Sequence, residues 1–157
     1  MPSTEEILKA AEQGNIARLS ALIANEADVN VRYVSDEGEC TPLHLAAENG
    51  HSGAVRVLVD AKATIDINDE ISYTPLHKAA LNGHSDVVQV LVDAKATVDI
   101  NDEIDVTPLH LAAECGHSGA VQMLVASKAT VDVRSQHGFT PLQIAAGSSH
   151  GNTVRLL

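Results

Sequence analysis

Histidine is the residue of this chain whose type and spacing most strongly suggest chemistry. Seven of its eight histidines recur in two sets, with 33 residues between the members of each set: His44, His77 and His110, and His51, His84, His117 and His150. A period of this length is typical of stacked units, whose equivalent residues lie about 10 Å apart. Zinc ligands lie about 2.0–2.3 Å from one shared ion. We therefore expect structural hydrogen bonds from these histidines and no metal site, with His137 on a loop.

A run of oxygen-bearing side chains offers calcium binding as a second candidate. Asp99, Asn101, Glu103 and Asp105 alternate with other residues, as the ligands of a calcium loop do. The run has no glycine at its sixth place, and His110 stands where a bidentate glutamate is needed. We expect no calcium site here. The sequence also lacks a glycine-rich phosphate loop, so we expect no cofactor.

The two cysteines are the remaining reactive side chains. Cys115 and His117 resemble a nucleophile and its base, but side chains two residues apart on a turn rarely face each other, and no third residue is evident to orient the histidine. We therefore expect no enzyme activity. Cys40 and Cys115 lie two units apart, which is about 20 Å, whereas a disulfide needs Cα atoms within about 7 Å. Free thiols fit a reducing compartment, so we expect a cytoplasmic or nuclear protein.

The elements that position these residues are clearest in the unit that begins at Thr74. Thr74 followed by Pro75 predicts the start of a helix, because threonine caps a helix and proline suits its first position. Asn82-Gly83 predicts its end. A second helix is predicted from Ser85 or Asp86 to about Val92, and a β-turn finger over 97–106. Small alanines on the first helix predict close helix packing.

The same pattern recurs along the chain. Thr-Pro-Leu-His begins at Thr41, Thr74 and Thr107, and Thr-Pro-Leu-Gln begins at Thr140; each is followed by Ala-Ala after one residue, and three units continue with Gly-His. In these residues the chain resembles the ankyrin repeats, over nearly its whole length. The resemblance implies an all-α solenoid of stacked helix-turn-helix units, with β-turn or hairpin fingers that line its concave side.

We expect one domain over 1–157 with irregular units at both ends. The expected units are an N-terminal capping repeat over 1–38, full repeats over 39–71, 72–104 and 105–137, and a partial repeat over 138–157. The first unit lacks the tetrapeptide, and its finger, Asn30 to Cys40, holds three extra residues. In the last unit Ser148-Ser149-His150 replaces Asn-Gly-His, and Leu157 is expected inside its second helix.

One departure from the ankyrin pattern is consistent. The family usually has glycine after the second helix, where the chain turns left-handed. The corresponding residues here are Glu26, Lys62, Lys95 and Lys128. A residue with a side chain costs about 1 kcal/mol in that conformation.

The formal net charge is −11, which repels nucleic acid and anionic lipid and favours a basic partner. Eleven of the 21 acidic residues, Asp36 and Glu37 among them, fall on the loops that precede the Thr-Pro motifs. They are either solvated loop tips or an acidic rim that steers a cationic ligand. No apolar run reaches the roughly 20 residues that cross a bilayer, and residues 1–6 lack the pattern of a signal peptide. We expect neither nucleic acid nor membrane as a partner.

The resemblance places partner binding on the fingers, just before each threonine, and on the first helix of each unit. The residues at these places that we expect to bind are Glu70, Ile71, Tyr73, Lys78, Leu81, Glu103, Ile104, Val106, Leu111, Glu114 and Phe139. Ile71, Tyr73, Leu81, Ile104 and Val106 would form an apolar stripe, rimmed by Glu70, Asp102, Glu103 and Asp105. The alternative is that Ile71 and Ile104 pack finger against finger.

We therefore predict a monomeric protein–protein interaction module, or scaffold, that binds another protein with a basic and apolar surface through its concave side. Three alternatives remain open. The chain could be the recognition fragment of a larger enzyme or effector. It could be an engineered scaffold without a natural partner, since residues 60–71 and 93–104 are nearly identical. The resemblance also implies asparaginyl hydroxylation at Asn30, although Asp66, Asp99 and Asp132 occupy that place later.

Overall fold

The computed structural model describes residues 3–35 and 38–157, so the acidic Asp36 and Glu37 lie outside the described residues. Within them the chain forms ten helices and two short strands. Five helices form an inner row: α1 (Thr4–Glu12), α3 (Pro42–Glu48), α5 (Pro75–Leu81), α7 (Pro108–Glu114) and α9 (Pro141–Gly147). Five form an outer row: α2 (Ile16–Ala24), α4 (Ser52–Asp60), α6 (Ser85–Asp93), α8 (Ser118–Ala126) and α10 (Gly151–Val154).

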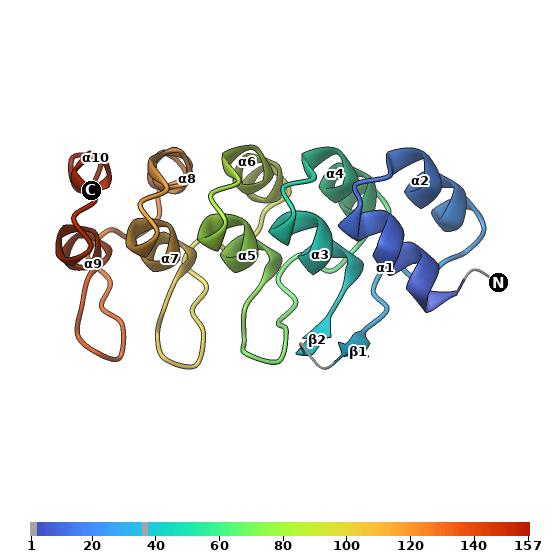
Figure 1. Cartoon of the computed structure of the whole chain (residues 1–157), viewed down its shortest axis with the longest axis horizontal. Coiled ribbons are helices and arrows are strands. Elements are labelled where there is room, and N and C mark those ends of the chain that lie inside the picture. The colour runs from blue at the N-terminus through green and yellow to red at the C-terminus, as the bar shows by residue number, and fades with distance from the viewer. Residues whose placement is uncertain (1–2, 36–37) are drawn as a thin grey trace.

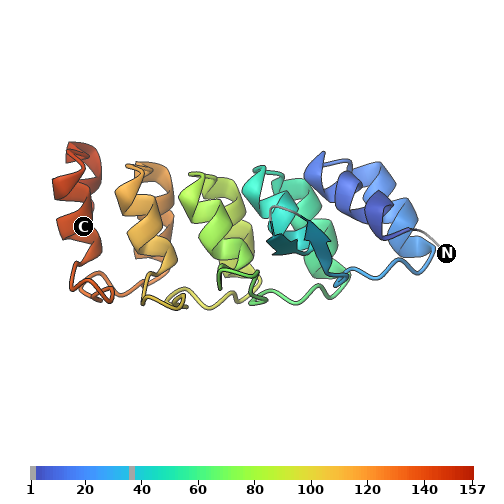
Figure 2. The same cartoon turned by 60° about the horizontal axis from the view of Figure 1, so that its bottom comes forward.

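The helices are arranged as pairs that stack along one axis. Each inner helix contacts the outer helix that follows it, and within each row every helix contacts the next one. Figure 1 shows the two rows, with the fingers below the inner row and the two ends of the chain at opposite ends of the stack. Figure 2 shows the same pairs from a second side. The predicted all-α solenoid is confirmed. No helix in the described residues is long and apolar enough to cross a membrane.

Helix α5 shows how the tetrapeptide starts an inner helix. Thr74 has an extended backbone, and its hydroxyl accepts a hydrogen bond from the backbone N–H of His77 at 3.4 Å. The backbone N–H of Thr74 in turn donates to His77 Nδ1 at 3.2 Å, which completes a capping box. Pro75 occupies the first turn. The helix ends before Asn82, and Gly83 follows with φ of 73°. Both predicted ends are confirmed.

The core is a series of thin layers between the two rows. On α5 the side chains of Leu76, Ala79 and Ala80 are at most 1% exposed. On α6 the side chains of Val87, Val88, Val90 and Leu91 are all buried. Because alanine has the smallest apolar side chain, neighbouring inner helices can approach closely. Each layer therefore depends on the helix pair beside it for its burial.

The first finger differs from the later ones. Strands β1 (Tyr33–Ser35) and β2 (Gly38–Cys40) pair antiparallel, with Tyr33 opposite Cys40 and Ser35 opposite Gly38. This is the finger with three extra residues, which give it the length for a strand pair. The later fingers, over residues 61–74, 94–107 and 127–140, contain turns and no strands.

The next two fingers are closed by aspartate side chains. Asp69 Oδ1 accepts hydrogen bonds from the backbone N–H groups of Ile71 at 3.0 Å and Tyr73 at 2.8 Å. Asp102 makes the same pair of bonds 33 residues later, at 2.9 and 2.8 Å. Each carboxylate thus replaces backbone partners that a strand pair would supply. Asp102 is only 8% exposed, so it does not belong to an exposed acidic rim.

A ladder of side chains joins the base of each finger to the next. Asn30 Oδ1 accepts a hydrogen bond from the backbone N–H of Thr64 at 2.7 Å. Asp66 and Asp99 do the same for the N–H groups of Thr97 and Thr130, at 3.0 and 2.8 Å. Asp99, the first residue of the calcium-like run, is therefore engaged in holding the fingers together.

The left-handed turns after the outer helices are confirmed. Glu26, Lys62, Lys95 and Lys128 have φ of 63°, 68°, 72° and 67°. The last unit gives two further results. Ser149 is also left-handed, with φ of 62°. The expectation that Leu157 lies within the final helix is wrong, because α10 ends at Val154 and Arg155 caps it.

Candidate functional site

The first set of histidines forms a buried hydrogen-bonded lattice. The backbone N–H of Thr41 donates to His44 Nδ1 at 3.3 Å, so the imidazole proton lies on Nε2. His44 Nε2 then donates to the carbonyl of Tyr73, in the next unit, at 2.9 Å. His77 and His110 bond the carbonyls of Val106 and Phe139 in the same way, at 3.1 Å each. The predicted structural role is confirmed. Burial lowers the pKa of all three histidines, which favours the neutral ring.

The second set joins neighbouring units at the C-terminal ends of the inner helices. Nε2 of His51, His84, His117 and His150 lies 2.9–3.0 Å from the carbonyls of Glu12, Glu48, Leu81 and Glu114, respectively. Each ring covers a left-handed glycine of the preceding unit. A Cβ atom built on Gly83 would lie 2.6 Å from His117 Nδ1. Over the described residues, no three His, Cys, Asp or Glu side chains come together as a metal site would require.

The cysteine–histidine pair shows no arrangement for catalysis. His117 Nε2 is hydrogen-bonded to the carbonyl of Leu81 at 3.0 Å, so this atom is occupied in holding two units together. Cys115 is an exposed residue. The pKa of its thiol is nevertheless raised, first by partial burial and then by the negative charge of Glu114. A raised pKa leaves less thiolate, which is the nucleophilic form.

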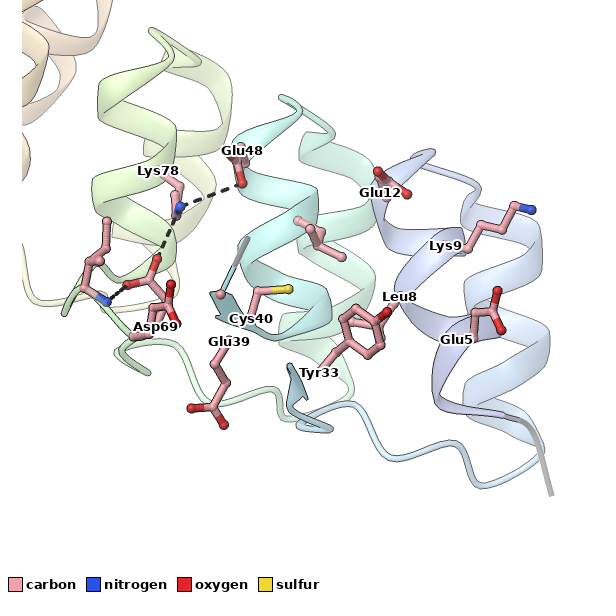
Figure 3. Close-up of a pocket in the computed structure, with 14 residues that line it drawn as sticks. Glu5, Leu8, Lys9, Glu12, Tyr33, Glu39, Cys40, Glu48, Asp69 and Lys78 are labelled. Carbon is pink, nitrogen blue, oxygen red and sulfur yellow. Dashed lines mark hydrogen bonds and ion pairs between the residues drawn. The ribbon is translucent and has the colours of Figure 1, made fainter. Parts of the chain in front are cut away.

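A groove of about 580 Å³ opens between inner helices and fingers in the N-terminal half. Its lining comes from α1, the β1–β2 hairpin, α3, the second finger and α5 (Figure 3). Clefts that hold small-molecule ligands have volumes of about 300–1,000 Å³. The groove is therefore large enough for a short segment of another chain.

Carboxylates dominate the charge of this groove. Six carboxylates line it, against the two amines of Lys9 and Lys78. Lys78 Nζ lies 3.2 Å from Asp69 and 3.9 Å from Glu48, and Figure 3 shows Lys78 reaching between these two side chains. Glu39 pairs with Arg32 at 3.2 Å. The structure shows no ion pair, among the residues that it describes, for the other three carboxylates, those of Glu5, Glu12 and Glu70.

Apolar and aromatic side chains line the groove beside these charges. Leu8 is 6% exposed and Leu45 is half-buried, whereas Tyr33 and Ile71 are 45% and 52% exposed. Cys40 is half-buried beside them. Burial raises the pKa of the Cys40 thiol, and the negative charges of Glu48, Asp69 and Glu12 raise it further. The groove thus combines exposed apolar surface with a negative potential.

The structure brings only three of the predicted binding residues into the groove: Glu70, Ile71 and Lys78. Ile104, Glu114 and Phe139 are exposed farther along the stack. Glu103 accepts a hydrogen bond from the hydroxyl of Ser72 at 3.2 Å. Leu111 is 4% exposed, so its side chain offers almost no surface to a partner.

The predicted residues Tyr73, Leu81 and Val106 are half-buried. The Tyr73 ring stacks on His77, with 5.2 Å between ring centroids. Ile71 and Ile104 remain 52% and 42% exposed, so packing between fingers does not cover them.

Sequence reasoning missed the part of the groove that comes from the first unit. These residues are Glu5, Leu8, Lys9, Glu12 and Tyr33. A signal existed for two of them, because the 36-residue offset that aligns Ala10-Ala11 with Ala46-Ala47 also aligns Glu12 with Glu48 and Lys9 with Leu45. The hairpin that presents Tyr33 has no counterpart in the other units, so no repeat pattern indicated it.

Comparison with known proteins agrees with this architecture. A family model described as ankyrin repeats (3 copies) matches residues 7–104 and 97–157. Cortactin-binding protein 2 of Dasypus novemcinctus is 45% identical over 58 residues, which are 37% of this chain and 3% of that protein. The same protein of Mus musculus is 41% identical over 58 residues, with the same shares. The chain thus matches only a small part of these relatives. On the family match, which covers most of its length, the chain belongs to the ankyrin repeat family.

Proposed function

We propose that this chain binds a partner protein through its concave surface, formed by the fingers and the inner helices. Ankyrin repeats generally act as protein-interaction modules, and the fold is of that kind. The observation that carries the proposal is the row of exposed apolar side chains on successive fingers: Ile71 is 52% exposed, Ile104 42% and Phe139 53%. Exposed apolar side chains that lie together often mark contacts.

The mechanism is the presentation of a preformed surface. Hydrogen bonds from buried histidines and ladder aspartates fix each finger to its neighbour, so little order has to be gained on docking. The formal charge of −11 favours a partner whose contact surface is basic around apolar anchors. We expect the association rate to fall as salt rises; an unchanged rate between low and high salt would remove the electrostatic part of the proposal.

The proposal also covers catalysis, the oligomeric state and the compartment of the chain. We propose that it acts by binding and not by catalysis, since His117 Nε2 is engaged in a hydrogen bond and the pKa of the neighbouring Cys115 thiol is raised. We propose a monomer in the cytoplasm or nucleus, where the free thiols of Cys40 and Cys115 would stay reduced. Sedimentation of the purified chain at several concentrations tests the monomer.

Affinity capture with matched variants tests the binding surface. The test variant carries Ile71→Glu and Ile104→Glu, which place charges on two exposed finger residues. The control carries Val131→Glu and Leu156→Glu, at residues that are 38% and 37% exposed outside the fingers' apolar row. Circular dichroism should first show equal helicity. We expect a partner that the parent and control retain and the test variant loses. Equal retention by all three would contradict the concave surface, and no partner for any would favour a designed scaffold.

A further inference from the structure

We propose that the groove between α1, the β1–β2 hairpin and α3 receives a lysine or arginine side chain of the partner, next to an apolar residue in the same short extended segment. This inference rests on the proposed function and deepens it, because it assigns the partner's chemistry to one end of the concave surface.

The shape of the groove supports a short segment as its occupant. A volume of about 580 Å³ accommodates a few side chains rather than a whole helix. Glu5 and Glu12 are seven residues apart on α1, so they lie on the same face of that helix, and both line the groove. Glu70 lines it from the second finger. A side chain that enters would therefore have carboxylates on more than one side.

The ion pairs leave part of the negative charge of the groove without a cationic partner among the described residues. Lys78 forms ion pairs with Asp69 and Glu48, and Arg32 forms one with Glu39. The exposed carboxylates of Glu5 and Glu12 have no such partner among the described residues. An ammonium or guanidinium group would find complementary charge here, whereas phosphate or a partner's carboxylate would be repelled.

The apolar lining argues against an acidic patch that is simply solvated. The Tyr33 ring, 45% exposed, offers a face on which a guanidinium can stack. Leu45 and Ile71 line the same groove and would contact an aliphatic side chain beside the cation. A segment that carries both kinds of side chain matches both parts of the lining. A bare cation would match only the carboxylates.

A selection from random dodecapeptides displayed on phage tests the inference, with the full chain as the bait. We expect enrichment of peptides that carry lysine or arginine next to leucine, isoleucine, valine or phenylalanine. Enrichment of peptides without a basic residue, or no enrichment over the bare support, would overturn the proposal. Calorimetry then measures the most enriched peptide as a synthetic probe.

Charge-matched variants locate the binding. Glu5→Gln with Glu12→Gln should weaken the peptide about tenfold, which corresponds to about 1.4 kcal/mol. The control, Asp60→Asn with Asp93→Asn, removes the same charge from the outer helices α4 and α6 and should change the affinity less than about twofold. Equal weakening by both pairs would show that only net charge matters and would overturn the groove as the site.

Cys40 provides a direct readout of occupancy. In a Cys115→Ser variant, Cys40 is the remaining cysteine, because the chain has two. Its alkylation by uncharged iodoacetamide should slow when the selected peptide is bound, and an unchanged rate at saturating peptide would overturn the proposal. If the groove fails these tests while Ile71→Glu with Ile104→Glu still loses the captured partner, the proposed function stands and only the inference about the groove fails.

Discussion

The same tetrapeptide has two different environments in this molecule. In the three interior units its leucine, Leu43, Leu76 or Leu109, is at most 1% exposed. In the last unit Leu142 is 39% exposed, and Gln143, at the place of the buried histidines, is exposed as well. The local helix start is the same, since Thr140 and Gln143 also form a capping box. A unit's own sequence thus forms its helix, whereas the following unit supplies most of its burial.

The largest expected effect distinguishes the two environments directly. Leu76→Ala should lower the free energy of unfolding by about 2–5 kcal/mol, because it leaves a cavity in a buried layer. Leu142→Ala should cost less than about 1 kcal/mol, because its side chain already meets solvent. Urea denaturation of both variants measures the difference. Equal losses would mean that the last unit is covered in solution, for example by a second molecule.

The contact between units provides the next test. Gly83→Ala should lower the free energy of unfolding by about 2 kcal/mol, since the backbone there is left-handed. The new Cβ would also lie 2.6 Å from His117. Gly147→Ala, in α9, meets no atom within 4 Å and should stabilise by about 0.5 kcal/mol. Thermal unfolding of the two variants gives the comparison, and a harmless Gly83→Ala would show that the histidine ring can move aside.

Protonation of the buried histidines should lower the stability of the interior units, whereas the last unit has Gln143 at the equivalent place. Burial lowers the pKa of His44, His77 and His110 from 6.5. The unfolded chain therefore takes up protons on these histidines at a higher pH than the folded chain does. The contribution of these histidines to the free energy of unfolding is complete above about pH 6.5 and is lost as the pH falls below it. The loss is at most about 1.4 kcal/mol per pH unit for each histidine.

Glutamine provides the control for this prediction. Gln143 Oε1 accepts a hydrogen bond from the backbone N–H of Thr140 at 3.0 Å, so glutamine keeps the cap without a titratable ring. A variant with glutamine at 44, 77 and 110 should show a flatter dependence of unfolding free energy on pH between 7 and 5 in urea titrations. An identical slope in parent and variant would contradict the assignment to these histidines.

The smallest expected effect concerns the left-handed lysines, which recur in interior units. Lys62→Gly should raise the free energy of unfolding, and the melting temperature with it, by relief of about 1 kcal/mol of backbone strain. The gain is reduced by the greater freedom of glycine in the unfolded chain. Calorimetric melting of the variant and the parent measures the net result. A clear drop would show that the lysine side chain stabilises this turn in another way.

The sequence predicted the local backbone structure more successfully than it predicted which side chains are exposed. Thr74, Pro75 and Gly83 each favour a local backbone geometry, so helix starts and ends followed from residue type. The left-handed turn at Lys62 followed only from the resemblance to the ankyrin repeats, because lysine disfavours that conformation. Exposure depends on neighbours in space. Leu111 is buried and Lys78 is not, although both stand four residues after a threonine of the repeat.

The groove was predicted least well because half of it lies outside the repeat pattern. Tyr33 reaches it from a strand pair that, in the described part of the chain, occurs in the longest finger alone. The spacing of the later units carries no information about that hairpin. The shift of 36 residues that aligns Glu12 with Glu48 was visible in the sequence, but without the fold it did not show which α1 side chains face the second finger.

Ser149 bears on how an array of this kind can lengthen by duplication. It is left-handed at the place of Gly116, where a Cβ atom would lie 2.5 Å from the ring of His150. A copied unit that brought the same histidine after Ser149 would meet a side chain in the space that the ring needs. Interior units, with glycine there, can be copied next to one another without that conflict. A unit that carries glycine at this place therefore accepts a copied neighbour more readily than a unit that carries serine there.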